Sequence, residues 1–292
     1  MAEKVNVVMD SQLLTTLQAC PRLTDFKFNI NLGPKERSNS LETGSLVHVI
    51  LEAYYKSLLK PEPRGYALDR AFEKGEEYIR LGEDGTGLHA TPEESEGWKV
   101  GYKNVLQTMR DYFHYYSNDN WCPIAAEEVR GAVIYEDEEM KVLWKAKYDL
   151  IADLPNGISS VDHKTMKQRR DTLSLSNQFM GQCVLLNTRS MWVNKIGFQK
   201  SLKDSDRFAR TQIAYTKNRL DEWINDIVPF YARMFIAYAE AGYFPPNFTH
   251  CENKYGMCSF KPVCEVDKGM REEMLMNDYI KLTPWDVKNE PD

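Results

Sequence analysis

The chain has 292 residues, of which 42% are hydrophobic and 27% are charged, and its net charge is −6. A chain of this length and composition can bury one large core or two modest ones, and its composition is not that of a disordered protein. The negative charge argues against a general nucleic-acid coat protein, although it does not exclude a local basic groove.

The first elements along the chain are predicted to be helices. Asp10 can cap a helix within residues 10–27, where leucines recur at helical spacing. A second helix is expected over 40–59 and a third over 92–116. The first part of the chain is therefore predicted to be helical.

The middle of the chain changes to short β-rich runs. From Cys122 onward, three such runs are separated by the turn sequences YEDEE and PNG, which predicts a meander of strands. A helix is expected over 171–187, and two more strands over 190–198 and 210–215. A long amphipathic helix over 220–241 then precedes a group of cysteines.

This order of elements predicts an α/β (α+β) fold in which helical parts at both ends enclose a mixed central sheet. The sequence contains no internal repeat, low-complexity tract or obvious linker, so we expect a single domain over 1–292. Within it, the helical N-terminal part covers 1–120, the sheet core 121–216, and the C-terminal helix with the cysteine group 217–292.

No run approaches the roughly 20 apolar residues that span a bilayer, and the first residues lack a signal-peptide pattern. We therefore expect no membrane association and a cytoplasmic location. A protein of this kind encoded by a phage would act in the cytoplasm of its host.

Two neighbouring strands carry charged residues that can meet. If these strands pair around the PNG turn, Asp149 and Asp162 can project from the same edge. Because side chains alternate along a strand, Asp162 and Lys164 share one face and His163 points away. Two carboxylates beside an ammonium suit a divalent cation such as Mg²⁺ or Mn²⁺. The alternative is a solvated charged face on an edge strand.

Two predicted helices add polar residues to this group. Gly44, His48 and Glu52 follow one another at intervals of four, so they share a helical face, although a single helical histidine is often only a packing residue. Gln178 and Gln182 lie one turn apart on a later helix, where an amide could hold a phosphate or a sugar. The alternative for this pair is an ordinary polar stripe.

Basic residues follow directly after Lys164. The segment HKTMKQRR contains Lys167, Arg169 and Arg170, and a second cationic stretch covers 195–210. Charged runs are usually solvated loops, but here their position makes contacts with a phosphate backbone plausible. No base-reading motif is visible, so we expect little sequence specificity.

Taken in order, these motifs resemble the RecB-like branch of the PD-(D/E)XK nucleases. The motifs are a Cys-Pro pair, G-x-x-x-H-x-x-x-E, an Asp after an apolar strand, Asp-x-Lys, a glutamine and three late cysteines, and they extend from Ser11 to Cys264. Within this branch, the likeness is to the iron–sulfur exonucleases of the AddB and CRISPR-adaptation type.

The resemblance implies a restriction-endonuclease-like core and a role for each matching residue. It implies that the catalytic metal is bound by His48, Asp149, Asp162 and the backbone carbonyl of His163, with Lys164 serving the attacking water and Gln178 contacting substrate. Two positions depart from the family pattern. Ala146 stands where the family has a glycine, and Gln182 stands where it has an aromatic residue.

The cysteines point to a second metal centre. Six cysteines are too few for a disulfide scaffold in a chain of this length, but Cys251, Cys258 and Cys264 lie close together in sequence. The resemblance implies that Cys20 is their fourth partner and that the four thiols bind a 4Fe-4S cluster joining the first helix to the C-terminal tail. The spacing of the first clustered pair is longer here than the family often shows.

Other assignments of these cysteines are open. A tetrahedral zinc site with four cysteines is the main alternative, and His250 could replace one cysteine in either kind of site. Cys122 and Cys183 lie in apolar sequence and are expected to be buried packing residues.

The sequence thus predicts a Mg²⁺- or Mn²⁺-dependent DNA exonuclease with a structural iron–sulfur cluster, acting on single-stranded or duplex ends in recombination, repair or replication. A helicase or recombination protein is the expected partner. One alternative is a non-catalytic DNA-end-binding subunit of a recombination or CRISPR-adaptation complex. Another is an iron–sulfur redox protein without nuclease activity.

Overall fold

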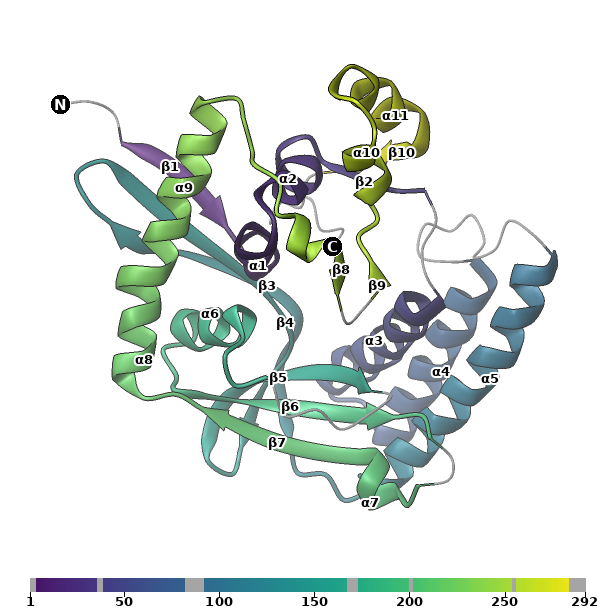
Figure 1. The fold of residues 1–292 in the computed structure, drawn as a ribbon. Coiled ribbons are helices and arrows are strands. Elements are labelled where there is room, and N and C mark those ends of the chain that lie inside the picture. The colour runs from purple at the N-terminus through teal and green to yellow at the C-terminus, as the bar shows by residue number, and fades with distance from the viewer. Residues whose placement is uncertain are drawn as a thin grey trace.

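The computed structural model describes residues 4–35, 39–81, 92–166, 173–199, 202–253 and 256–283. One central sheet lies between two groups of helices, which confirms the predicted mixed α/β architecture (Figure 1). The strands of the central sheet are β1 (Val5–Met9), β3 (Cys122–Glu136), β4 (Met140–Leu154), β5 (Gly157–Met166), β6 (Ser190–Gly197) and β7 (Phe208–Ala214).

The helices precede, interrupt and follow these strands. They are α1 (Ser11–Ala19), α2 (Pro21–Thr24), α3 (Asn39–Leu58), α4 (Arg64–Leu81), α5 (Pro92–Tyr115), α6 (Asn177–Leu185), α7 (Asp204–Arg207), α8 (Lys217–Glu222), α9 (Val228–Glu240), α10 (Lys261–Glu265) and α11 (Arg271–Asp278). Two small antiparallel pairs complete the description: β2 (Leu32–Pro34) with β10 (Tyr279–Lys281), and β8 (Glu252–Asn253) with β9 (Gly256–Met257).

Strand β4 organises the sheet. Along one edge it pairs antiparallel with β3 for almost its whole length. Along the other edge it pairs first with β1, in parallel as far as Trp144, and then with β5, antiparallel from Leu150 onward. The two neighbours on this edge therefore separate over residues 145–149, and β6 and β7 continue the sheet beyond β5.

Each face of the sheet buries its own apolar core. Helices α3, α4 and α5 pack on one face, over Leu150, Ala152 and Val161. Helices α1, α6, α8 and α9 pack on the other face, where Trp144 and Trp223 meet edge to face with ring centroids 4.7 Å apart. The sheet is thus covered on both sides, and the strands that carry the polar residues are held between two cores.

A third, smaller core joins the two ends of the chain. Phe26 from the N-terminal region packs against Phe260, Val263 and Tyr279 from the C-terminal region. Strands β2 and β10 pair beside this core. Residues more than two hundred positions apart in sequence therefore form one small packed unit.

Most predicted elements are present at nearly the expected bounds. The helix predicted over 40–59 is α3, the helix over 92–116 is α5, and the three predicted strands after Cys122 are β3, β4 and β5. Asp10 caps α1 as expected, because its carboxylate accepts a hydrogen bond of 2.7 Å from the Leu13 amide. The helix predicted from residue 171 begins later, at Asn177.

Several elements were not predicted, and two of them belong to the main layers of the fold. Strand β1 lies in the part expected to be helical, and helix α4 follows α3 directly. Ala67, Ala71, Gly75 and Tyr78 of α4 are buried, and Leu68, Phe72 and Ile79 pack beside them against the same core. These residues recur at helical spacing, so α4 is amphipathic, and the sequence analysis overlooked the pattern. In addition, the helix predicted over 220–241 contains a π-helical turn at Trp223–Ile227 between α8 and α9.

Within the part of the chain that the structure describes, none of the helices combines the length and the apolar character that a bilayer crossing needs.

A close contact between α6 and β4 leaves no room for a side chain at Gly181. A β-carbon added at Gly181 would lie 2.2 Å from Nε1 of Trp144, a fully buried ring that is itself packed against Trp223. We expect Gly181→Ala to lower the free energy of unfolding by about 1–3 kcal/mol, because neither ring can move aside without disturbing the core. Urea or thermal unfolding measures this change in the free energy of unfolding.

Gly65→Ala is the matched control, because a β-carbon at Gly65 in α4 meets no atom within 4 Å. This change should leave stability unaltered or raise it slightly, since alanine favours the helix. A Gly181→Ala protein as stable as the control protein would contradict the assigned packing.

Candidate active site

Asp149 and Asp162 meet where β1 and β5 separate along β4. Asp149 and Asp162 are the next residues after the last paired positions, Leu150 and Val161. The backbone amide of His163 donates a 2.7 Å hydrogen bond to Oδ2 of Asp149, which ties the two strands together through a side chain. The structure thus brings together the two carboxylates that the sequence analysis paired.

Lys164 and Gln178 enclose the carboxylate of Asp162. Nζ of Lys164 lies 3.1 Å and 2.9 Å from the two carboxylate oxygens of Asp162, and 3.3 Å from Oε1 of Gln178. Nε2 of Gln178 donates a 2.8 Å hydrogen bond to Oδ1 of Asp162. The Asp162 side chain is fully buried, whereas that of Lys164 is 36% exposed, so the ammonium lies at the boundary with solvent.

His48 reaches this group from α3. Its Nδ1 atom lies 3.7 Å from Oδ2 of Asp149. Leu46, Val47 and Ile50 on the same helix are buried in the core, and this packing fixes the face on which His48 stands. The predicted helical face therefore places His48 beside Asp149.

Glu127 is a member of the site that the sequence analysis missed. The pairs Ala126–Leu150 and Glu128–Tyr148 flank it, so Glu127 lies opposite Asp149 on β3. One ligand atom from each of His48, Glu127 and Asp149 can be chosen so that all three lie within 4.8 Å of one another. No other such group of three histidine, cysteine or acidic residues occurs among the residues the structure describes.

The backbone at Glu127 is unusual for a strand. Its φ is 55°, in the left-handed region that a non-glycine residue adopts only at some cost. Lys147 holds the carboxylate through an ion pair of 3.1 Å. The doublet Glu127-Glu128 was visible in the sequence, but only the register of β3 against β4 shows which of the two faces Asp149.

The electrostatics of the site are those of crowded, buried carboxylates. Burial, followed by the neighbouring Asp162 carboxylate, raises the pKa of Asp149 to about 7. Burial, followed by Asp149, raises the pKa of Glu127 to about 7. Burial also lowers the pKa of His48, which keeps its imidazole neutral. Neutral imidazole and acidic oxygens are the donor types that bind divalent cations, and a bound cation would relieve the carboxylate repulsion.

The side chain of His163 lies on the opposite face of β5 from Asp162 and Lys164, as expected, but its ring meets that of His48 edge to face with centroids 6.2 Å apart. Its ring stacks on Tyr55 with a centroid distance of 5.6 Å, and its Nδ1 atom lies 2.8 Å from Nδ2 of Asn194. Burial lowers the pKa of His163 well below its ordinary value, so the ring is neutral. His163 therefore contacts Asp149 through its backbone amide, while its buried ring packs between His48 and Tyr55.

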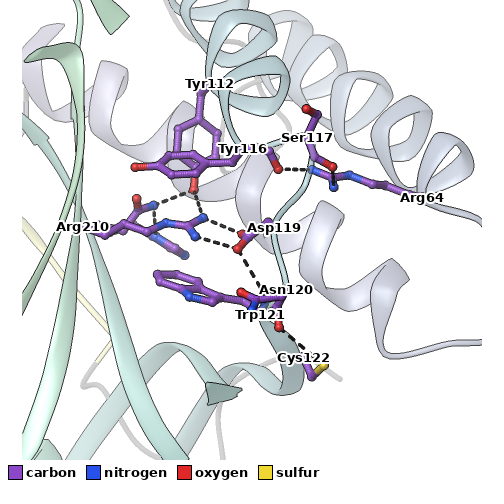
Figure 2. A network of polar contacts seen from close by, with 11 residues as sticks. Arg64, Tyr112, Tyr116, Ser117, Asp119, Asn120, Trp121, Cys122 and Arg210 are labelled. Atoms are coloured by element: carbon purple, nitrogen blue, oxygen red, sulfur yellow. Dashed lines mark hydrogen bonds and ion pairs between the residues drawn. The ribbon is translucent and has the colours of Figure 1, made fainter. Parts of the chain in front are cut away.

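A buried polar network supports His163 from behind. Asn194 Nδ2 also lies 3.0 Å from the Tyr112 hydroxyl, which in turn accepts a 3.3 Å hydrogen bond from Arg210. Figure 2 shows Arg210 directed at Asp119, which it contacts at 2.6 Å and 2.8 Å. The guanidinium lies between Tyr116 and Trp121, 3.7 Å and 3.4 Å from their ring centroids. Through Asn194, this network fixes His163 on β5, whose backbone amide holds Asp149.

The four cysteines of the predicted second centre lie together. Cys20, Cys251, Cys258 and Cys264 line one pocket, together with His250. The Asn247 amide donates to Sγ of Cys20 at 3.3 Å. Burial, followed by the nearby cysteines, raises the pKa of Cys251 and of Cys258, although for Cys258 a backbone hydrogen bond opposes this.

The remaining predictions have mixed outcomes. Cys183 is fully buried, as expected, but Cys122 is exposed, so the expectation that it packs in the core was wrong. It stands at the start of β3, at the edge of the sheet, where an apolar sequence context does not ensure burial. Lys167, Arg169 and Arg170 lie outside the described residues, and their proposed DNA contacts stay a prediction.

Comparison with known proteins places this arrangement in a wider context. The sequence model of the PD-(D/E)XK nuclease superfamily matches residues 12–265. A candidate exonuclease from Eubacterium rectale is 16% identical, with 89% of this chain and 94% of that chain covered and a TM-score of 0.45. An alkaline exonuclease from Laribacter hongkongensis is 10% identical, with 70% and 93% covered and a TM-score of 0.29. No curated protein matches the chain.

The raised pKa of Asp149 predicts a specific pH dependence of stability in the presence of a chelator. Between the ordinary pKa of 3.8 and about 7, the unfolded chain releases the proton that the folded chain retains, so rising pH favours unfolding. Asp149→Asn removes this charge but keeps an oxygen that can accept from the His163 amide. The variant should melt at least about 5 °C above the wild type at pH 8 and close to it at pH 4.

Asp153→Asn, at an exposed position of the same strand, is the control. Manganese should raise the melting temperature of the wild type at pH 8 and have little effect on Asp149→Asn, because the variant lacks a ligand. A melting difference between the wild type and Asp149→Asn that stays constant from pH 4 to pH 8 would refute this account.

Proposed function

The chain belongs to the PD-(D/E)XK nuclease superfamily, and from this we propose that it is a metal-dependent deoxyribonuclease that hydrolyses phosphodiester bonds at DNA ends. The observation that carries the proposal is the convergence of His48, Glu127 and Asp149 beside the Asp162–Lys164 pair. We propose that the whole chain forms one nuclease domain, since β2 and β10 join its two ends.

The donor atoms at the site fit Mg²⁺ or Mn²⁺. We propose that His48, Glu127, Asp149, Asp162 and the backbone carbonyl of His163 hold the cation. Carboxylate and carbonyl oxygens suit both ions, and the imidazole favours Mn²⁺ over Mg²⁺. A bound divalent cation lowers the pKa of water and neutralises the charge that develops on the phosphate.

The protein groups next to the cluster have complementary roles. Lys164 presents its ammonium at the solvent boundary, where it can orient the attacking water and stabilise negative charge on the phosphate. Asp162 and Gln178 hold that ammonium by accepting hydrogen bonds from it. Gln178, which contacts the Lys164 ammonium, is close enough to it to contact the same substrate. The intact set of groups favours catalysis over a purely DNA-end-binding role.

We further propose that the chain is of the iron–sulfur exonuclease type found in AddB and CRISPR-adaptation nucleases. Cys20, Cys251, Cys258 and Cys264 share one pocket, which brings residues from both ends of the described chain together. A 4Fe-4S cluster takes one thiolate at each of its four irons, so the number of cysteines matches. A single tetrahedral zinc ion takes the same number, and the metal content decides between the two.

The nuclease assignment is tested by Lys164→Ala on end-labelled single-stranded and duplex DNA. We expect the rate to fall at least about a hundredfold with either Mg²⁺ or Mn²⁺, because the ammonium orients the attacking water and stabilises the charge on the phosphate. Chelator should stop cleavage by the wild type, and circular DNA should resist it. Lys217→Ala, at an exposed position on α8, is the control. Near-normal cleavage by Lys164→Ala would remove the assignment.

The cysteine assignment is tested by metal analysis of anaerobically purified protein. We expect iron and sulfide with absorption near about 400 nm, and loss of both in Cys20→Ala. Cys122→Ser should keep the iron, because that thiol is exposed and stands apart from the pocket. A colourless protein with one zinc per chain would instead establish the zinc alternative.

A further inference from the structure

A groove between α3 and α4 lies outside the cluster described above. It encloses about 320 Å³. One side is formed by Glu52 and Lys56 of α3 and by Lys60 in the turn that follows, and the other side by Tyr66, Arg70 and Lys74 of α4. Within each set the residues are four positions apart in sequence. Those in the helices therefore share one helical face, and Lys60 continues the row beyond the end of α3.

The groove is locally basic in an acidic protein. Four of its lining residues are cations and two, Glu52 and Glu62, are anions, in a chain whose net charge is −6. The ion pairs Lys56–Glu52, Arg70–Glu73 and Lys74–Glu77 are all largely exposed. Such pairs are weak, so these cations can exchange their carboxylate partners for phosphate at little cost.

The groove is continuous with the candidate active site through α3. His48, Glu52 and Lys56 follow one another at intervals of four on the same helical face, and His48 lies 3.7 Å from Asp149. Glu52 is close enough to the cluster to act electrostatically on Glu127. At 1.5 Å per residue, the path from His48 to Lys60 extends about 18 Å.

The shape of the groove restricts its ligand. Its two sides are neighbouring packed helices, whose axes are typically about 8–10 Å apart, so the space between their side chains cannot admit a nucleic-acid duplex. Cations spread over the length of the groove suit a chain of phosphates rather than one phosphate group. Tyr66, which is 49% exposed at the far end, offers a ring for stacking a base.

We propose that the α3–α4 groove binds the phosphate backbone of a single nucleic-acid strand that extends from the candidate active site. The inference rests on the proposed nuclease function and adds a preference for a single strand at this surface. Lys56, Lys60, Arg70 and Lys74 contact phosphates, and Tyr66 supports a base at the end of the track.

The test compares the wild type with the triple variant Lys60→Ala, Arg70→Ala, Lys74→Ala. The control is Lys141→Ala, Lys217→Ala, Arg219→Ala, which removes the same charge from exposed ion pairs outside the groove. Figure 1 shows α8, which carries two of the control residues, on the opposite side of the sheet from α3 and α4. The probes are fluorescent single-stranded deoxyoligonucleotides of 2 to 20 nucleotides and a blunt duplex.

Binding is measured by anisotropy with Ca²⁺ in place of Mg²⁺, and cleavage is measured separately with Mn²⁺. We expect wild-type affinity to rise with strand length, and the groove variant to lose this rise and bind the longest strand at least about tenfold more weakly. The slope of log affinity against log salt should fall by about 2, as three lost phosphate contacts predict. Cleavage of the dinucleotide should be unchanged.

The outcomes separate this inference from the proposed function. If the wild type cleaves DNA but both triple variants bind the longest strand equally well, the groove is not the track. If the groove variant loses duplex binding as strongly as single-strand binding, the assignment to a single strand is wrong. If the wild type cleaves no DNA, the nuclease proposal fails, while the binding data still decide whether the groove takes a strand.

Discussion

The separation of β1 and β5 along one edge of β4 is the constraint on which the rest of the site depends. A continuous strand on that edge would pair with the backbone at Asp149 and occupy the space beside it. The split instead lets the Asp149 side chain accept a hydrogen bond from the His163 backbone amide. It also opens the space into which α3 brings His48.

Charged and polar partners hold most of the ionisable side chains around this gap. Lys164 and Gln178 satisfy Asp162, and Lys147 holds Glu127. Behind the strands, Arg210 is held by Asp119 and lies between two aromatic rings. The repulsion between Asp149 and its neighbouring carboxylates remains. A divalent cation bound between them would offset it.

The sequence revealed those parts of the site that lie in short local patterns. Asp162 and Lys164 share a strand face, and His48 shares a helical face with Glu52. The regular spacing of side chains along a strand and along a helix was therefore enough to predict these positions. Glu127 could not be found this way. The hairpin register at Tyr135–Val142 would set Glu128 against Asp149, but the bulge between Val133 and Tyr135 shifts the register by one residue. Helix α4, by contrast, carries a helical pattern of apolar residues that was overlooked, since Leu68, Phe72 and Ile79 recur on the side that packs on the core.

The small core that joins Phe26 to Phe260 has a consequence for the order of biosynthesis. A ribosome extends the chain by about 5–20 residues per second, so Cys20 emerges roughly tens of seconds before Cys251. The strands and helices that carry His48, Asp149 and Gln178 are complete by then, and they can fold while the last segment is still being made. The cysteine pocket therefore closes after these elements have been made, and a nascent chain holds Cys20 without its three partners throughout that interval.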